Sequence, residues 1–237
     1  MLPLSKQNVY REKYKRRRPG WQTSGGEFEA LTRRYITPEA RVLDFGCGRG
    51  GVMELFWQGV KLAVGVDPDY ASLAERRAKM PVVCGQGEAL PLAPEGFDLV
   101  IGLWVLEHLS QPERVLREIG RTLAPGGHFI FLTPNAQHPL IWANRLSWAM
   151  PAVQRLLIPR LYGRAEADTF RTYYRANTLA QLGGLAGACG FQVASLRAIS
   201  DPTYLAFNEL SFRMSILLES LLPRGWGVHL LGDWVKR

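Results

Sequence analysis

Three glycines and two aspartates mark the part of the sequence where chemistry is expected. Gly46, Gly48 and Gly51 have the G-x-G-x-x-G spacing of loops that bring the backbone close to a bound nucleotide. Asp44 precedes this loop, and Asp67 follows it at the end of a second apolar run. An acid at that place can accept both hydroxyls of an adenosine ribose. The spacing therefore predicts a ligand that contains adenosine, and both NAD and S-adenosylmethionine (SAM) meet that condition.

The charge of Asp44 separates these two ligands. NAD carries a diphosphate, which a neighbouring carboxylate repels, whereas SAM carries an ammonium and a sulfonium and has no phosphate. At about 4 Å and an effective dielectric near 20, the difference amounts to about a few kcal/mol before desolvation. Asp44 therefore favours SAM, although a carboxylate at this position can also serve to cap a turn.

The elements that must position these residues alternate between short apolar runs and helical patterns. We expect strands over 42–45, 62–66, 82–84, 97–101, 128–132, 191–196 and 227–235, and helices over 25–35, 52–58, 71–79, 112–123, 177–189 and 204–222, with a turn at 125–127. This alternation predicts an α/β fold, a doubly wound, Rossmann-like and mostly parallel seven-stranded sheet with helices on both faces. In such a sheet the ligand binds beyond the carboxyl ends of the strands, next to the first strand.

Two segments interrupt the alternation and a third precedes it. We expect a basic N-terminal arm over 1–22, and one domain over 23–237 with lid insertions at about 136–175 and 203–225. The first insertion reads as two short helices broken at Pro151, apolar and rich in arginine. Such helices can cover an apolar substrate, lie on an anionic bilayer or pair into a dimer. The preferred interpretation is a lid over the substrate.

Charge and composition limit the classes of function. Residues 1–18 contain seven basic residues and one acidic residue, so they hold +6 of the formal charge of +8. The body of the protein is therefore not expected to bind nucleic acid, while the arm could meet RNA or anionic lipid or be a solvated terminus. The three cysteines show no metal-ligand or disulfide spacing. No apolar stretch follows the basic residues, so we expect a cytoplasmic protein without a signal peptide or metal, with peripheral membrane contact as an option.

Four motifs in order carry a resemblance to a known family. They are VLDFGCGRGG (42–51), AVGVDPD (63–69), GQGEALPLAPEGFDLVIGLWVLEHL (85–109) and VLREIGRTLAPGGHFIFLTPN (115–135). Together they resemble the class I SAM-dependent methyltransferases, in the type-11 branch that includes enzymes of ubiquinone and menaquinone pathways. The resemblance covers about residues 40–135.

The resemblance implies a set of cofactor residues. The methionine end of SAM would lie against the glycine loop, the ribose against the acid that ends the second strand, and the adenine against the residue after it and a later loop. The implied residues are Asp44, Gly46, Cys47, Gly48, Asp67, Pro68, Gln86, Gly87, Glu88 and Leu103. Gln86 departs from the family, which often has Asp there, although its carbonyl oxygen can still accept a hydrogen bond from the adenine amino group.

The acceptor side is less clearly marked. Methyl transfer from a sulfonium is an in-line displacement that needs alignment and a dry pocket, and a hydroxyl acceptor gains from a base. His108, just past the fourth strand, is the candidate general base, with a structural histidine as the alternative. His138, Tyr173 and Tyr174 are candidates for the acceptor pocket, and packing roles remain open for all three.

The sequence thus predicts a SAM-dependent methyltransferase that acts on a small-molecule or lipid-like acceptor, at oxygen or carbon, as a monomer or homodimer. One alternative is an RNA or protein methyltransferase that uses the basic arm. Enzymes of the superfamily that methylate base or amide nitrogens commonly have an Asn/Asp-Pro-Pro-aromatic motif after the fourth strand, and the segment 102–105 reads GLWV instead. A non-catalytic SAM-binding protein is the other alternative, and an NAD-dependent oxidoreductase is a distant one.

Overall fold

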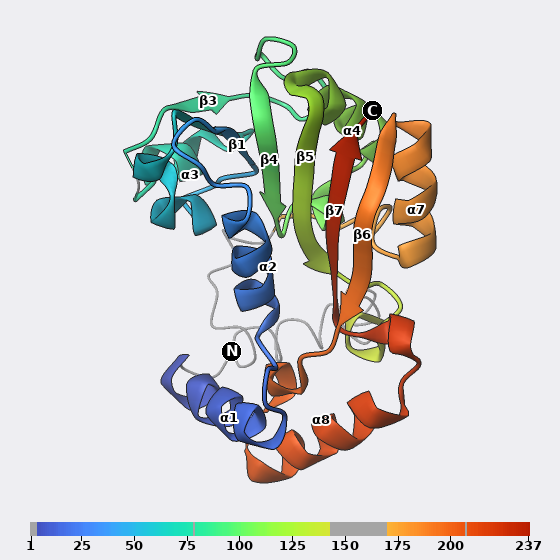
Figure 1. Ribbon diagram of the computed structural model, residues 1–237. Coiled ribbons are helices and arrows are strands. Elements are labelled where there is room, and N and C mark those ends of the chain that lie inside the picture. The colour runs from blue at the N-terminus through green and yellow to red at the C-terminus, as the bar shows by residue number, and fades with distance from the viewer. Residues whose placement is uncertain (1–3, 78, 143–169, 207) are drawn as a thin grey trace.

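The computed structural model describes residues 4–77, 79–142, 170–206 and 208–237, and its centre is one seven-stranded sheet (Figure 1). The strand order is β3-β2-β1-β4-β5-β7-β6, and β7 is antiparallel to both of its neighbours. The strands are β1 (Arg41–Phe45), β2 (Leu62–Asp67), β3 (Val82–Cys84), β4 (Phe97–Leu103), β5 (Leu123–Pro134), β6 (Phe191–Ile199) and β7 (His229–Lys236). The predicted fold class is therefore confirmed.

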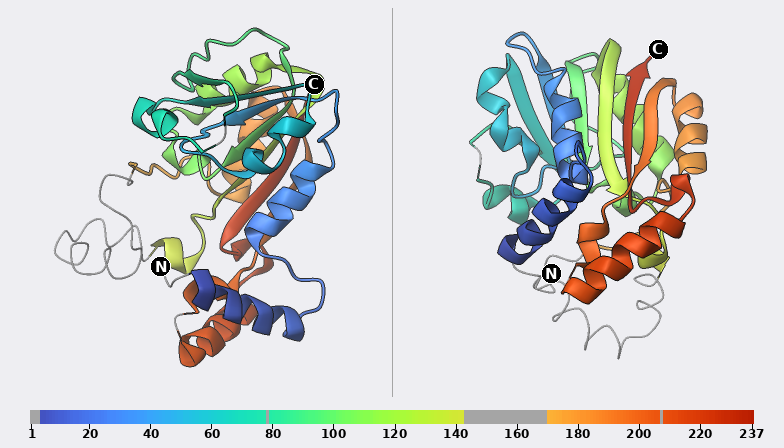
Figure 2. Two further views of the ribbon diagram at one scale, coloured as in Figure 1. Left: turned by 90° about the vertical axis from the view of Figure 1, so that its left-hand side faces the viewer. Right: turned by 60° about the horizontal axis from the view of Figure 1, so that its bottom comes forward.

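Each face of the sheet has its own core, because successive side chains of a strand point to opposite faces. On one face, Phe129 and Phe131 of β5 belong to a buried cluster with α4 (Pro112–Thr122) and α7 (Leu179–Ala188). On the other face, Ile130 and Leu132 belong to a cluster with α2 (Ser24–Arg33), the 3₁₀ helix η1 (Val52–Leu55) and α3 (Tyr70–Ala74). Figure 2 shows the helices on both sides of the sheet.

Strand register brings the predicted site together. β1 pairs in parallel with β2 on one side and β4 on the other, with Phe45 opposite Val66 and Gly102. The loops that follow these three strands therefore leave the sheet at one edge. The glycine loop, the residues after Asp67 and the residues after Leu103 meet there, as a doubly wound sheet requires.

Three local expectations within residues 52–127 are wrong. The segment 52–58 forms two 3₁₀ helices, η1 and η2 (Trp57–Gly59), in place of one α-helix. So short a segment gains few helical hydrogen bonds to offset nucleation, and it includes the β-branched Val52 and two aromatic residues. Helix α3 ends at Ala74 instead of 79. The turn expected at 125–127 lies within β5, beside a register shift against β4.

The described part of the basic arm is a packed helix, α1 (Leu4–Arg17). It lies beside α8 (Glu209–Leu221), where Tyr14 and Phe212 form a separate small core with Ala206. Figures 1 and 2 show both helices beyond the carboxyl ends of β4 and β5, where the 203–225 insertion is expected. A short 3₁₀ helix, η5 (Pro202–Leu205), precedes α8, so the helix predicted over 204–222 begins late. No helix among the described residues combines the length and apolarity needed to cross a bilayer.

Most of the first insertion lies outside the described residues, including the two helices expected around Pro151. The domain boundary at residue 22 stays a prediction.

Candidate cofactor site and acceptor side

The glycine loop after β1 has a backbone that side chains would obstruct. Gly46 has φ of 74°, and a Cβ there would lie 2.3 Å from a methyl carbon of Val105. The backbone N–H groups of Gly46 and Cys47 both donate to the carbonyl of Val66, at 2.8 and 3.2 Å. Gly48 also has positive φ, 48°, and among the described residues a Cβ there would meet only the Asp67 carboxylate, at 4.0 Å. The side of Gly48 that faces Asp67 is therefore open for a ligand.

The Asp67 carboxylate is held in place at the end of β2. Its Oδ2 accepts a hydrogen bond from the Gly48 N–H at 2.9 Å, and its Oδ1 accepts one from the Asp69 N–H at 2.8 Å. A carboxylate oxygen has two lone pairs, so each of these oxygens retains capacity for one more donor. Two ribose hydroxyls are donors of that kind. Asp67 is only half-buried, so such donors can reach it.

Asp44 on β1 is a buried carboxyl group whose Oδ2 has no hydrogen-bond partner among the described residues. Burial, together with the smaller effects of the charges of Asp67 and Glu54, raises the pKa of Asp44 to about 7. An ionised carboxylate in such a place is costly unless it is paired. A cationic ligand would supply the missing partner, whereas an anionic ligand would add a negative charge to those of Asp44, Asp67 and Glu54. The residues present therefore fit SAM and do not fit a dinucleotide diphosphate.

The other predicted cofactor residues fall into two groups. Gln86, Pro68 and Glu88 are exposed or half-exposed beside the carboxyl ends of β2 and β3, where adenine contact stays a prediction. Cys47, Gly87 and Leu103 are packed against neighbouring side chains, and their contact with the cofactor also stays a prediction. The Cys47 thiol is buried in the sheet beside Gly65, and burial raises its pKa to about 12. A Cβ on Gly87 would lie 2.9 Å from the Phe45 ring, and Leu103 packs against a core cluster.

The structure brings His108, Tyr173 and Tyr174 together. The backbone N–H groups of both tyrosines donate to the Glu107 carbonyl, at 2.7 and 3.2 Å, and His108 Nδ1 lies 3.0 Å from the Arg171 carbonyl oxygen. A carbonyl only accepts, so Nδ1 carries the proton in this hydrogen bond. In the neutral ring, Nε2 then holds a lone pair, which is the state a general base needs.

Tyr174 is buried and has φ of 53°, while Tyr173 is half-buried under Arg171 and Arg175. Tyr174 packs against Ala136 and Ile141, and this contact supports the packing role for its ring.

Glu107, the neighbour of His108, belongs to a buried hydrogen-bond network. It is buried, and its Oε2 accepts from the Thr133 hydroxyl at 3.0 Å. Asn177 in turn donates to the Thr133 hydroxyl at 2.7 Å. This network ties the end of β4 to β5 and to the start of α7.

His138 belongs to a different group of side chains. Its Nδ1 accepts from the Leu140 N–H at 3.2 Å, and its Nε2 lies 3.6 Å from Glu219 of α8. Asp201 and Ser215 line the same small cavity. His138 is 2% exposed, so the structure supports a packed polar role under α8 rather than an open acceptor contact.

Two residues that no sequence signal identified lie beside the glycine-loop edge. The Ser24 hydroxyl is 2.7 Å from His229 Nδ1, although the residues are 205 positions apart in the chain. The His229 ring makes an edge contact with Trp104, with ring centroids 4.7 Å apart. Burial lowers the pKa of His229 to about 3, so the ring is neutral at physiological pH.

Trp104 directly follows β4 and is strained. Its φ is 59°, an uncommon value for a residue other than glycine, and the side chain is 37% exposed. The backbone N–H of Trp104 donates to the Leu132 carbonyl at 2.9 Å, and this hydrogen bond holds the residue between the ends of β4 and β5. An exposed aromatic ring held at this position is suited to contact a ligand.

Comparisons with known proteins agree with this geometry. A family model described as a methyltransferase domain matches residues 43–131. A ubiquinone biosynthesis O-methyltransferase of Pseudomonas fluorescens is 32% identical over 179 residues, covering 72% of this chain and 70% of that protein. A probable S-adenosylmethionine-dependent methyltransferase of Mycolicibacterium smegmatis is 37% identical over 97 residues, and the chain spans only 38% of its length. A crystal structure of an S-adenosylmethionine-dependent methyltransferase from Mesorhizobium loti has a TM-score of 0.60 at 15% identity, over 90% of this chain and 98% of that one.

The fold and the anionic glycine-loop site define a class I SAM-dependent methyltransferase domain. The chain belongs to the SAM-dependent methyltransferase family, in the branch that the sequence motifs indicate. Its cofactor is accordingly SAM, as the sequence predicts.

Proposed function

We propose that the protein transfers a methyl group from SAM to a small-molecule or lipid-like acceptor, with oxygen as the preferred methylated atom. The observation that carries this proposal is the buried Asp44 carboxyl, whose Oδ2 has no hydrogen-bond partner among the described residues and which is close enough to Asp67 for their charges to interact, because it suits a cationic ligand. The P. fluorescens relative, named for O-methylation in ubiquinone biosynthesis, supports a small acceptor and transfer to oxygen.

SAM would supply the electrophilic methyl group on its sulfonium, and the chain supplies binding and alignment. Asp67 would accept the ribose hydroxyls, and Asp44 and the Gly46–Gly48 backbone would hold the methionine end. Trp104 and the aromatic residues of the 170–174 segment would exclude water from the acceptor. His108 would take the proton from an acceptor hydroxyl at Nε2, because its Nδ1 proton is held by the Arg171 carbonyl.

An acceptor panel tests this function. Formation of S-adenosylhomocysteine from SAM should be measured with catechols, polyprenylated phenols, sterols, RNA and peptides. Turnover with a phenol or catechol supports the proposal, and turnover with RNA or a peptide alone would replace it with the alternative that uses the basic arm. SAM binding without turnover on any acceptor would favour a non-catalytic SAM-binding protein.

His108→Asn separates base chemistry from binding. If His108 is the base, kcat falls by about 10² to 10⁴-fold while SAM affinity is unchanged. Glu113→Gln on the exposed side of α4 is the matched control, since its carboxylate forms an ion pair with the exposed Arg117. Unchanged kcat in His108→Asn would remove His108 from the chemistry.

A further inference from the structure

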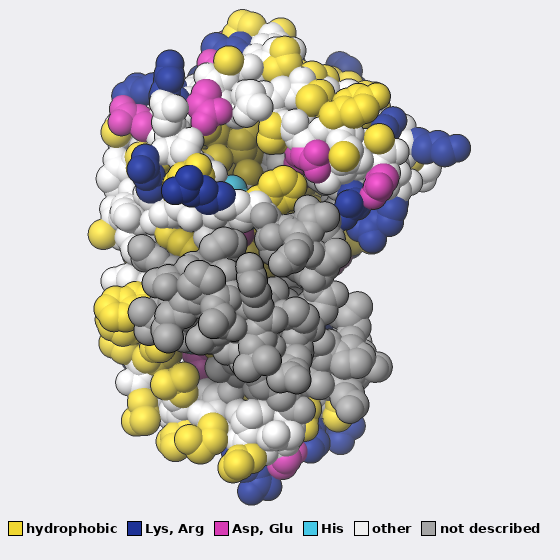
Figure 3. All heavy atoms as spheres, turned by 180° about the vertical axis from the view of Figure 1, so that it is seen from behind, with side chains coloured by type: hydrophobic (Ala, Val, Ile, Leu, Met, Phe, Trp, Pro, Cys, Tyr) yellow, Lys and Arg dark blue, Asp and Glu magenta, His cyan; other side chains and the backbone are white. Residues whose placement is uncertain are grey.

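Helix α8 carries a stripe of four large apolar side chains on its outer side. Leu210, Met214, Leu217 and Leu221 are 71, 56, 52 and 75% exposed. They recur at intervals of four, three and four residues, a spacing that places side chains along one side of an α-helix. The opposite side of α8 is buried through Phe212. Figure 3 shows hydrophobic side chains gathered along the lower edge of the molecule, where α8 runs.

A strongly basic helix adjoins this stripe. Tyr10 of α1 packs on Phe212 with ring centroids 5.1 Å apart, and Lys13 of α1 forms a 2.6 Å ion pair with Glu209 of α8. The views of Figure 2 agree that α1 and α8 lie side by side. The segment 1–18, which includes α1, has a net charge of +6.

The apolar and basic surfaces are continuous. At about 100° per residue, the exposed Arg213 falls between the apolar stripe and the side of α8 that meets Lys13. Arg16 follows on the exposed surface of α1, one turn from Lys13. Cations therefore border the apolar stripe along the side that faces α1.

We propose that α1 and α8 together form a docking surface for an anionic lipid bilayer. The stripe of α8 would enter the boundary between headgroups and acyl chains, and the cations of α1 and Arg213 would meet lipid phosphates. A second copy of the chain is the other candidate occupant of an apolar stripe. A twofold contact would bring two basic α1 surfaces toward each other, so charge favours the bilayer.

Vesicle co-sedimentation of the full chain tests the docking surface. Vesicles of pure phosphatidylcholine are compared with vesicles of phosphatidylcholine mixed with phosphatidylglycerol, with no SAM or acceptor present. The protein should sediment with the mixed vesicles, bind pure phosphatidylcholine at least about tenfold more weakly, and lose binding as salt rises. Because no methyl transfer is involved, this result stands or falls separately from the proposed function.

Paired variants locate the surface. Met214→Asp with Leu217→Asp should weaken binding to the mixed vesicles by at least about tenfold, because two apolar contacts are replaced by charges that the lipid repels. Val193→Asp is the control, since Val193 is 40% exposed on the edge strand β6. Should the double variant fail to fold by circular dichroism, Leu221→Asp in the last turn of α8 makes the same test.

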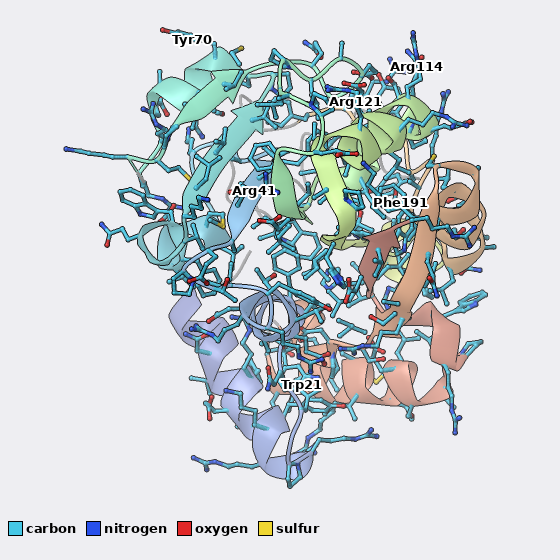
Figure 4. All side chains as sticks on the ribbon, turned by 45° about the horizontal axis from the view of Figure 1, so that its top comes forward. Trp21, Arg41, Tyr70, Arg114, Arg121 and Phe191 are labelled. Atoms are coloured by element: carbon cyan, nitrogen blue, oxygen red, sulfur yellow. The ribbon has the colours of Figure 1, made fainter. Side chains whose placement is uncertain are left out.

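Charge reversal tests the basic part. Arg16→Glu should weaken binding to the mixed vesicles by about thirtyfold, because the reversal changes the charge by two units at about 1 kcal/mol per unit charge near the surface. Arg114→Glu on α4 changes the net charge equally and should bind like the wild type. Figure 4 shows Arg114 at the opposite end of the molecule from Trp21, which packs on Tyr14 of α1.

Three results would overturn the proposal. The first is no sedimentation of the wild type with either kind of vesicle. The second is equal binding by the wild type and by both stripe variants. The third is a protein that does not bind vesicles and that forms a dimer in light scattering, which Leu217→Asp dissociates. That result would assign the stripe to a second copy of the chain.

Discussion

At the scale of single residues, Asp44 and Asp67 could be identified from the sequence, and the Ser24–His229 pair could not. The spacing of Asp44 and Asp67 from the glycines can be read directly from the sequence. It brings both aspartates to one site because β1 and β2 are adjacent in the sheet. Ser24 and His229 come from opposite ends of the chain and meet only through the complete fold. The sequence also suggested that His138 contacts the acceptor. In the structure His138 is buried beside Glu219 of α8, a neighbour that only the complete fold brings to it.

Asp67→Ala should weaken SAM binding by roughly 1.5–3 kcal/mol, the range for a hydrogen bond to a charged group. The loss has two sources, the ribose contact and the anchoring of the Gly48 N–H. Isothermal titration calorimetry measures it. Asp69→Ala is the control, because Asp69 caps α3 through the Ala71 and Ser72 N–H groups and is expected to leave SAM affinity within about twofold. Equal affinity of wild type and Asp67→Ala would exclude Asp67 from the site.

Asp44 predicts a pH dependence of SAM affinity. Its pKa is raised to about 7 in the free protein, so the carboxyl is neutral below that pH and ionised above it. A cationic ligand binds the ionised form better and releases a proton when it binds at lower pH. Affinity should therefore fall by up to about tenfold per unit as pH drops below about 7, and level off above it.

Asp44→Asn provides the comparison for this pH series. Its SAM affinity should be lower than that of the wild type at pH values above about 7, and it should lack the change centred near pH 7. Identical pH profiles for the two proteins would show that Asp44 does not respond to the ligand.

At the scale of elements, the strands were predicted better than the helices. Continuous apolar runs mark buried strands, and β1 and β2 lie within one residue of the bounds that this signal predicts. Helix ends depend on contacts that a local pattern does not include. Segment 52–58 is an example, since Glu54 turns back over Gly50 and pairs with Arg77 instead of extending a helix.

Strand β7 provides a stability prediction. Gly232 lies opposite Phe131 of β5, and a Cβ there would come within 2.2 Å of the Phe131 ring. Gly232→Ala should therefore lower the free energy of unfolding by about 1–3 kcal/mol, the usual cost of overpacking. Gly183→Ala in α7, where a Cβ meets open space, should raise it by up to about 1 kcal/mol. Urea denaturation measures both, and a neutral Gly232→Ala would contradict the tight β5–β7 packing.

At the scale of the whole molecule, the alternation of elements predicted the sheet and its faces. The antiparallel insertion of β7 between β5 and β6 depends on a long-range pairing that alternation alone does not specify. The α1–α8 core was also beyond prediction. The charge of the arm left open contact with RNA, contact with anionic lipid or a solvated terminus, whereas Tyr14 is 6% exposed in a packed core.

The most direct test is a calorimetric titration of the purified protein with SAM and, separately, with NADH, near neutral pH. The carboxylates of Asp44, Asp67 and Glu54 at the glycine loop predict saturable binding of SAM and no measurable heat from NADH. Binding of NADH at the same stoichiometry, without affinity for SAM, would contradict the assignment of this site to a cationic adenosyl ligand.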